Sequence, residues 1–169
     1  VLSNWGNELT SEDVHWVFSK AFELHNIGEW RWGCVAGLKK SDGVEPLDKY
    51  TLRFSLRNRN PHFQSYLFFA TPNMVDTTEI KKHVTPDDPW GQNWLARNVA
   101  GFGPYEMITA TEHETTLKAR PNYWAGTSPI SSVTLRQVTS RAEGIATLDG
   151  PEPSIVIGLR CDETKKLLK

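Results

Sequence analysis

The chain has 169 residues, of which 38% are hydrophobic and 23% charged, a composition typical of a folded globular domain and not of a disordered segment. Its net charge is -1, so no basic excess points to nucleic acid or to an anionic membrane surface. No run of apolar residues approaches the length that spans a membrane.

The first predicted element is a helix from about Ser11 to His25. Thr10 is a good N-cap, and Glu12 and Asp13 place negative charge in the first turn, where the helix dipole favours it. Apolar residues then recur at helical spacing and predict one buried face, made of Val14, Val17, Phe18, Ala21 and Leu24.

Two tryptophans flank an arginine in the loop that we predict after this helix. Trp30 and Trp32 lie in the sequence Glu-Trp-Arg-Trp-Gly, residues 29–33. One interpretation is that a ring packs down onto the helix. The other is an aromatic wall that faces a ligand, since binding pockets are mostly apolar and aromatic with a few polar groups. The residues alone do not separate the two interpretations.

Alternation of apolar and polar residues predicts a half-buried strand at residues 50–57. The apolar positions of this strand are Tyr50, Leu52, Phe54 and Leu56. A short helix or turn is then expected at residues 62–69, and a short helix at residues 77–84. A further short helix should carry Trp90, Trp94 and Leu95 on one face.

The stretch from Ala100 to Trp124 predicts a tight turn followed by a hairpin. We expect Gly101 and Gly103 to supply backbone with positive φ, and Pro104 to fix φ beside them. A strand should then begin at Tyr105, with residues 114–120 as its antiparallel return.

The last part of the chain alternates between predicted strands and helices. A strand is expected at residues 133–138, a helix at 141–148, a second strand at 154–157 and a last helix after Asp162. This order is typical of an α/β unit with a parallel crossover, so the fold class is a mixture of helices and strands, α/β or α+β.

No residue pattern indicates catalysis. The five histidines are scattered, and none shows metal-ligand spacing beside a carboxylate. Residues 112–114 (Glu-His-Glu) would alternate between the faces of a strand, so a solvated hairpin tip is the better interpretation. We therefore expect no enzyme, no metal and no cofactor. Cys34 and Cys161 fit no zinc or redox motif, and we predict two independent thiols, buried or half-buried.

Several segments are similar to one known family. Residues 7–14 resemble the pattern Gly-x-Pro-Leu-Thr-Ala-Glu-Asp-Val, and residues 47–54 resemble Val-x-Asp-x-Tyr-Thr-Val-x-Phe. Residues 101–105 and 119–124 resemble Gly-Thr-Gly-Pro-Tyr and Arg-Asn-Pro-x-Tyr-Trp. These are patterns of the bacterial extracellular solute-binding proteins of family 5, which serve oligopeptide, dipeptide and nickel ABC importers.

The resemblance implies a longer, two-lobed protein with a periplasmic-binding-protein type II-like fold. Residues 1–103 would be the smaller subdomain of the first lobe, residues 104–169 part of its main α/β subdomain, and the second lobe would lie outside this chain. The chain departs from the family patterns at Phe102, and at residues 119–120, where Ala-Arg replaces Arg-Asn.

The resemblance also implies the site. The loop after the first helix contributes an aromatic contact in the family, which favours Trp30 and Trp32, and a main-chain contact is expected at Gly158, Leu159 and Arg160. For Arg160 an ordinary surface charge is the alternative. The ligand class stays open between a peptide, which leads, and a nickel complex, a sugar or an opine.

The implied function is solute capture in the periplasm or outside the cell for ABC permease subunits, with no nucleic acid as partner. Contact with the membrane would run through the permease or through a lipid anchor outside this chain. The alternative is a carbohydrate-binding or other aromatic-platform module, suggested by seven tryptophans. Predicted helices that alternate with strands argue against the all-β sandwich of such modules.

Overall fold

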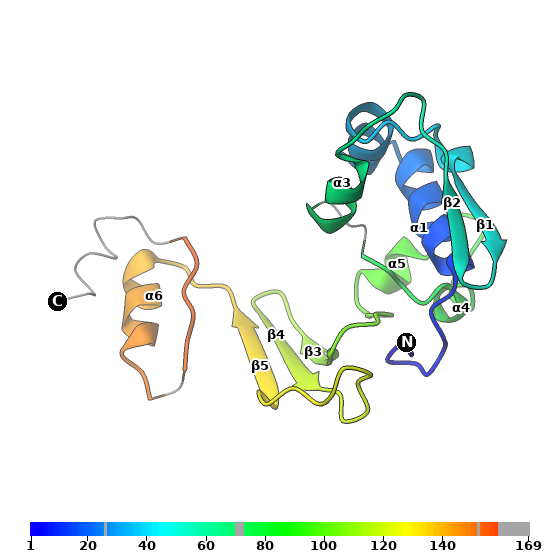
Figure 1. Ribbon diagram of the computed structural model, residues 1–169. Coiled ribbons are helices and arrows are strands. Elements are labelled where there is room, and N and C mark those ends of the chain that lie inside the picture. The colour runs from blue at the N-terminus through cyan, green and yellow to red at the C-terminus, as the bar shows by residue number, and fades with distance from the viewer. Residues whose placement is uncertain (26, 70–72, 152, 159–169) are drawn as a thin grey trace.

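Figure 1 shows a computed structural model of the chain, which describes residues 1–25, 27–69, 73–151 and 153–158. The N-terminal body contains α1 to α5, an antiparallel sheet follows, and α6 lies at the far end of the molecule. In chain order the elements are α1 (Ser11–Glu23), α2 (Ile27–Glu29), η1 (Trp30–Val35), η2 (Ser41–Gly43), β1 (Val44–Asp48), β2 (Thr51–Phe54), α3 (Phe63–Phe69), α4 (Thr77–Ile80), α5 (Gln92–Leu95), β3 (Tyr105–Ala110), β4 (Glu114–Ala119), β5 (Ser132–Arg136) and α6 (Arg141–Leu148).

Helix α1 begins with a capping box. The Asp13 carboxylate accepts hydrogen bonds from the amide and the hydroxyl of Thr10, both at 2.8 Å. The helix ends at Glu23, two residues before its predicted end, and His25 then takes a left-handed conformation with φ of 46°. Its inner face packs into the main core cluster, which consists of Phe18, Phe22, Trp32, Ala36, Leu38 and Val44.

The predicted strand at residues 50–57 is present but shorter. β2 pairs antiparallel with β1, and a register shift interrupts the ladder between Pro46 and Asp48. Leu52 and Phe54 pack against the core cluster while Arg53 is exposed, so the predicted alternation is confirmed. Tyr50, predicted on the same apolar side, lies instead in the turn between the strands and is 64% exposed, so the prediction is wrong for this residue.

Asp13 and Asp76 are two buried aspartates that connect segments far apart in the sequence. Asp13, which caps α1, also accepts hydrogen bonds from the amide of Thr77 at 3.0 Å and from its hydroxyl at 2.7 Å. Asp76 is the N-cap of α4 and accepts from the Ser3 hydroxyl at 2.5 Å and from the Asn7 side-chain amide at 2.9 Å. The N-terminal segment, α1 and α4 are therefore held by two carboxylates.

The three predicted short helices are present with different bounds. The helix expected at 62–69 is α3, and the one expected at 77–84 ends earlier, as α4. The third is α5, which begins after Trp90, so the shared face predicted for Trp90 and Trp94 is wrong. Trp90 packs on Trp16 with 5.0 Å between ring centroids, whereas Trp94 stacks on His83 at 4.3 Å.

The predicted hairpin is present and gains a third strand. β3 pairs antiparallel with β4, and β4 pairs antiparallel with β5. The register aligns Met107 with Leu117 and Leu117 with Val133, which gives the sheet one apolar face. The neighbouring row on the other face aligns Lys118 with Ser132 and is polar.

The turn before β3 does not use the left-handed backbone that we predict for its glycines. Positive φ occurs at other glycines of the described chain, and neither Gly101 nor Gly103 is among them. The prediction is wrong because this segment is tied on both sides: Gly101 forms a bridge with Val75, and its carbonyl accepts from the Asn4 amide at 3.1 Å.

The parallel crossover predicted for the last part does not form among the described residues. Residues 154–157 belong to no strand, and Figure 1 shows them beside α6 and away from β5. A strand needs a neighbour that satisfies its backbone groups, and within the described part of the chain β5 pairs with β4 alone. Ile155 and Ile157 are each 91% exposed. Helices and antiparallel sheets together still give the mixed fold class that the sequence predicts.

Arg120 joins the sheet to the N-terminal segment. Its guanidinium donates hydrogen bonds to the carbonyls of Gly103 at 3.0 Å, Leu2 at 3.1 Å and Ser3 at 2.7 Å. A planar guanidinium with several fixed donors suits such a set of convergent carbonyls. Arg120, which departs from the family pattern, therefore connects the start of the chain to the segment before β3.

The prediction of a buried or half-buried thiol is wrong for Cys34, which is exposed and free. Its neighbours Trp32 and Gly33 are buried, so Cys34 occupies the outer side of η1. Cys161 lies outside the described residues, as does the helix predicted after Asp162.

Replacing Asp76 by alanine should lower the free energy of unfolding by about 3 kcal/mol, because each buried donor left without a partner costs about 1–3 kcal/mol. The donors concerned are the Ser3 hydroxyl, the Asn7 side chain and the Glu79 amide. Urea denaturation measures the change. Asp42→Ala, at an exposed aspartate, is the control and should stay within about 0.5 kcal/mol of the parent. Equal effects of the two substitutions would contradict the role of Asp76.

Asp88 should make stability depend on acid pH. The amides of Asn93 and Gln92 hydrogen-bond its carboxylate and hold its pKa below the usual value. Because the pKa is lower in the folded state, this stabilisation is present above about pH 4 and is lost as pH falls through the folded pKa. Asp88→Asn should lower the melting temperature by a few degrees at pH 7, and the difference should shrink at about pH 3. Thermal scans of this variant and of the exposed control Asp87→Asn test it.

Candidate functional site

The two tryptophans predicted as ligand contacts have different environments. Residues 30–35 form the π-helix η1, where we predict a loop, and side chains two positions apart on a helix point to different sides. Trp32 is 2% exposed, and its ring packs edge-on against Phe18 at 4.8 Å between centroids. Trp30 is 58% exposed. The packing interpretation therefore describes Trp32, and Trp30 is the ring that a solute could reach.

The second predicted contact falls at the edge of the described chain. Gly158 has φ of 93°, a left-handed conformation that favours glycine, and it lines a small hollow beside α6 together with Ser140 and Val156. Leu159 and Arg160 lie outside the described residues. Gly158 and Trp30 are not brought together, because α6 and the body that contains α1 lie at opposite ends of the molecule (Figure 1).

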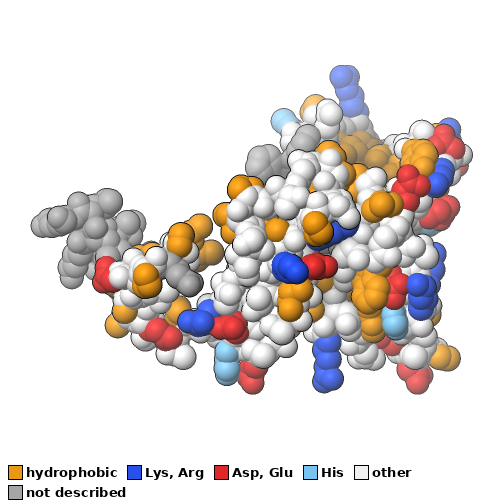
Figure 2. All heavy atoms as spheres, turned by 90° about the horizontal axis from the view of Figure 1, so that it is seen from below, with side chains coloured by type: hydrophobic (Ala, Val, Ile, Leu, Met, Phe, Trp, Pro, Cys, Tyr) orange, Lys and Arg blue, Asp and Glu red, His pale blue; other side chains and the backbone are white. Residues whose placement is uncertain are grey.

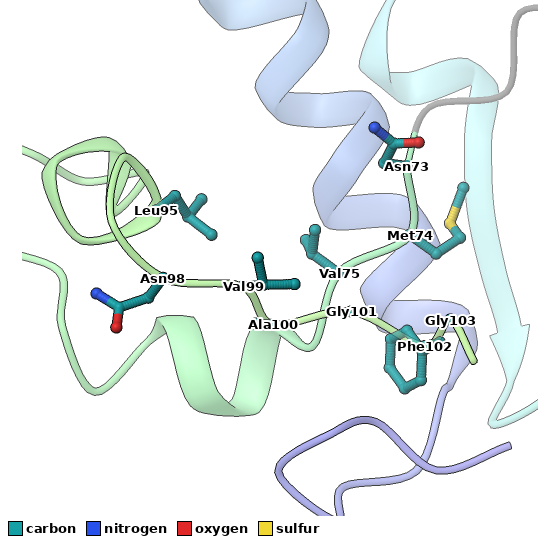
Figure 3. A pocket seen from close by; sticks show the side chains of 10 residues that line it. All are labelled: Asn73, Met74, Val75, Leu95, Asn98, Val99, Ala100, Gly101, Phe102 and Gly103. Carbon is teal, nitrogen blue, oxygen red and sulfur yellow. The ribbon is translucent and has the colours of Figure 1, made fainter. Parts of the chain in front are cut away.

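We call the turn before β3, residues 101–104, the central turn. A groove of about 530 Å³ lies between this turn, α5 and the segment before α4. Residues 73–75, Leu95 and residues 98–103 line it. Figure 3 shows the side chains of Val75, Leu95 and Val99 converging from three segments. Local sequence patterns mark this turn by its glycines and Pro104 but predict no groove, because the groove depends on contacts between segments about 25 positions apart.

Among the residues that the structure describes, no titratable side chain lines the groove. The backbone behind it is already hydrogen-bonded, since the Val99 carbonyl accepts from the Asn4 side-chain amide at 2.8 Å, and the Gly101 amide donates to the Asn4 side-chain oxygen at 2.9 Å. Polar side chains in the lining are limited to Asn73 and Asn98. The groove therefore offers apolar surface and two carboxamides.

The described residues contain no cluster of three or more His, Cys, Asp or Glu side chains that could hold a metal ion. Glu112 and His113 are exposed at the hairpin tip, as predicted, and Glu114 forms an ion pair with Arg136 at 2.9 Å. On the face in Figure 2, basic and acidic side chains are interspersed and do not gather in a patch of one sign.

The family model described as bacterial extracellular solute-binding proteins, family 5, middle region, matches residues 4–156 of this chain. The chain belongs to this family. The match covers α1, the central turn and α6, and thus nearly every element described above. No sequence among the curated proteins matches significantly.

Solved structures show the fold to which this chain contributes. The periplasmic binding protein DppA from Helicobacter pylori, in complex with the peptide STSA, has a TM-score of 0.74 and 17% identity over 99% of this chain and 34% of its own. A nickel ABC transporter protein from Bacillus halodurans has a TM-score of 0.71 and 20% identity over 99% of this chain and 31% of its own. MoaA from A. tumefaciens R10, in complex with mannopinic acid, has a TM-score of 0.67 and 23% identity over 86% of this chain and 27% of its own.

This family 5 chain therefore spans about a third of the length of these solved proteins, between 27% and 34%. The expected fold, part of a two-lobed periplasmic binding protein with helices and antiparallel sheets, is confirmed. A carbohydrate-binding or other aromatic-platform module is not favoured, because the family is one of solute-binding proteins. Among the described residues no helix has the length and apolar character needed to cross a membrane.

Trp32→Ala should lower the free energy of unfolding by about 3–5 kcal/mol, because it opens a cavity in the core beside Phe18. Trp30→Ala removes an exposed ring and should cost less than about 1 kcal/mol. Urea denaturation followed by circular dichroism compares the two variants. A large loss for Trp30→Ala would show that its ring is structural and unavailable to a solute.

Proposed function

We propose that this chain is part of the first lobe of a solute-binding protein, which captures a small solute outside the cytoplasmic membrane and delivers it to the permease subunits of an ABC importer. The family match over residues 4–156 carries this proposal. Relatives of the same fold that were solved with a peptide and with mannopinic acid are further support.

Within that lobe, residues 1–103 would be the smaller subdomain and residues 104–169 part of the main one. Two observations support this division. The main core cluster is drawn wholly from residues 18–44, whereas the antiparallel sheet begins at Tyr105. Hydrogen bonds of Arg120 and Asn4 connect the two parts, and the main core cluster contains no described residue of the sheet.

The solute would contact Trp30 and the main chain at Gly158, Leu159 and Arg160. Trp30 is suited to this role because its ring is exposed on a helix that its neighbour Trp32 anchors in the core. Clamp proteins close two lobes around a ligand, so contacts on one lobe provide only part of the affinity. Small peptides are the leading solute class. The protein would act in the periplasm or at the outer cell surface, with any lipid anchor outside this chain.

Isothermal titration calorimetry of the full-length gene product and of the 169-residue chain tests the proposal. We expect the full-length protein to bind members of a di- to pentapeptide pool and the chain alone to bind weakly or not at all, since half of the clamp is missing. Trp30→Ala in the full-length protein should weaken binding about tenfold, which corresponds to about 1.4 kcal/mol. Its melting temperature should stay unchanged.

Tight peptide binding by the chain alone would contradict the two-lobed clamp. Parallel titrations with a nickel–histidine complex, a sugar mixture and mannopinic acid separate the other ligand classes. If the folded full-length protein ignores peptides and binds one of these, peptide capture is wrong and that class replaces it.

A further inference from the structure

Four cationic residues gather at one end of the N-terminal body. Residues 37–43 and 55–60 run side by side there, joined by an antiparallel bridge between Leu38 and Leu56. We call the exposed cations of these two segments the basic cluster, which consists of Lys39, Lys40, Arg57 and Arg59. The connection from β2 to α3 lies at the end of the body remote from the sheet β3–β5 (Figure 1), and this end is turned away from the viewer in Figure 2.

The two segments have an excess of positive charge that the whole chain lacks. They contain four basic residues and one acidic residue, Asp42, a net charge of +3, whereas the chain as a whole has -1. Within the described part of the chain, none of the four cations forms an ion pair. Arg53 of β2 is different, because it pairs with Glu45 at 3.2 Å. The net charge of the sequence therefore conceals a basic cluster that the pairing of two separate segments creates.

The backbone beneath the basic cluster is held in place by the core and by hydrogen bonds. Leu38 is fully buried in the main core cluster. The Arg57 amide donates to the Gly37 carbonyl at 2.8 Å, and the Lys39 amide donates to the Ser55 carbonyl at 3.3 Å. A site built on an ordered backbone keeps the spacing of its side chains, so their attractions to one anionic partner act together.

Lys40 has a backbone conformation that favours glycine. Its φ of 58° and ψ of -158° lie in a region that residues with a side chain rarely adopt. The turn is fixed by its neighbours, since Leu38 is buried before it and the Gly43 amide donates to the Lys40 carbonyl at 3.2 Å. A glycine would make this turn without strain, so the fold does not require a lysine. Strained residues concentrate at functional sites, which points to a use for the charged side chain.

The surroundings of the basic cluster favour a flat anionic partner. Neither the groove nor the hollow beside α6 is lined by its residues. The large hydrophobic side chains that are exposed in the described chain all lie outside residues 31–46 and 51–69. Protein–protein interfaces usually depend on apolar or aromatic contacts at their centre. Lipid headgroups need no such contacts, because charge alone attracts basic residues to an anionic membrane surface.

We propose that the basic cluster binds the headgroups of an anionic phospholipid membrane and so orients the protein on that surface. The four cations approach the lipid phosphates, whose negative surface potential attracts Lys and Arg. This direct contact is additional to the permease and to the lipid anchor that the family resemblance implies. It is weak and reversible, and it does not depend on which solute the protein captures.

Co-sedimentation with lipid vesicles tests the proposal on the full-length protein, prepared without any lipid anchor. One set of vesicles contains phosphatidylcholine with about 30% phosphatidylglycerol, and the reference set contains phosphatidylcholine alone. At about 0.1 M salt we expect at least about tenfold stronger association with the anionic vesicles. Most of this association should be lost at about 1 M salt, where the screening length falls from about 10 Å to about 3 Å.

A matched pair of variants tests whether the basic cluster, and not the net charge, is responsible. The cluster variant carries Lys39→Gln, Arg57→Gln and Arg59→Gln. The control removes the same number of charges at exposed residues outside the cluster, with Lys81→Gln, Arg97→Gln and Lys118→Gln. The cluster variant should bind anionic vesicles at least about tenfold more weakly than the parent, because each basic residue near such a surface is worth about fivefold. The control should change binding less than about threefold.

Lys40→Gly separates the charged side chain from the fold. The substitution relieves the strained backbone, so the melting temperature should stay the same or rise. Binding to anionic vesicles should nevertheless weaken about fivefold, because one charge is lost. Loss of binding in a variant that is not less stable cannot come from unfolding, so this variant decides the question even if the triple variant folds poorly.

Several outcomes would overturn the membrane contact. These are equal association with both sets of vesicles, association that survives about 1 M salt, and equal binding by the cluster variant and the control. Binding of the purified permease that depends on the basic cluster, without binding to vesicles, would assign the cluster to an acidic protein surface instead. Calorimetric solute binding by the cluster variant should match the parent, so failure of the membrane contact leaves solute capture standing.

Discussion

The buried carboxylate of Asp76 is the contact on which the N-terminal body depends. It caps α4, and it binds Ser3 and Asn7 from the start of the chain. Helix α4 has only four residues, far too few to be stable alone, so its position comes from Asp76 and from the contact of Asp13 with Thr77. Because the same segment forms one wall of the groove, this hydrogen bonding also places the groove.

Hydrogen bonds join the body to the sheet. Arg120 and Asn4 form these bonds with backbone groups on both sides of the central turn. Such bonds fix the orientation of the two parts, because a hydrogen bond weakens steeply when donor and acceptor are misaligned. The apolar face of the sheet stays partly open, with Leu135 56% exposed, in a chain that spans about a third of its solved relatives.

The residues that we propose as solute contacts lie far apart in the chain. Trp30 lies on η1, and Gly158 lies near α6. A binding protein that encloses its ligand draws contacts from several segments in this way.

The sequence by itself determined features that depend on neighbours in the chain. The cap at Thr10, the alternation of Leu52 and Phe54, and the hairpin after Pro104 are local, and so are the segments that identify the family. Tertiary structure alone decided which tryptophan is buried, since periodicity marks an apolar face without showing what covers it. It also decided that residues 154–157 pair with no strand of the described chain, and that Gly101 and Gly103 do not take positive φ in the turn before β3. Strand pairing and backbone conformation both depend here on segments distant in the sequence, which no local pattern reports.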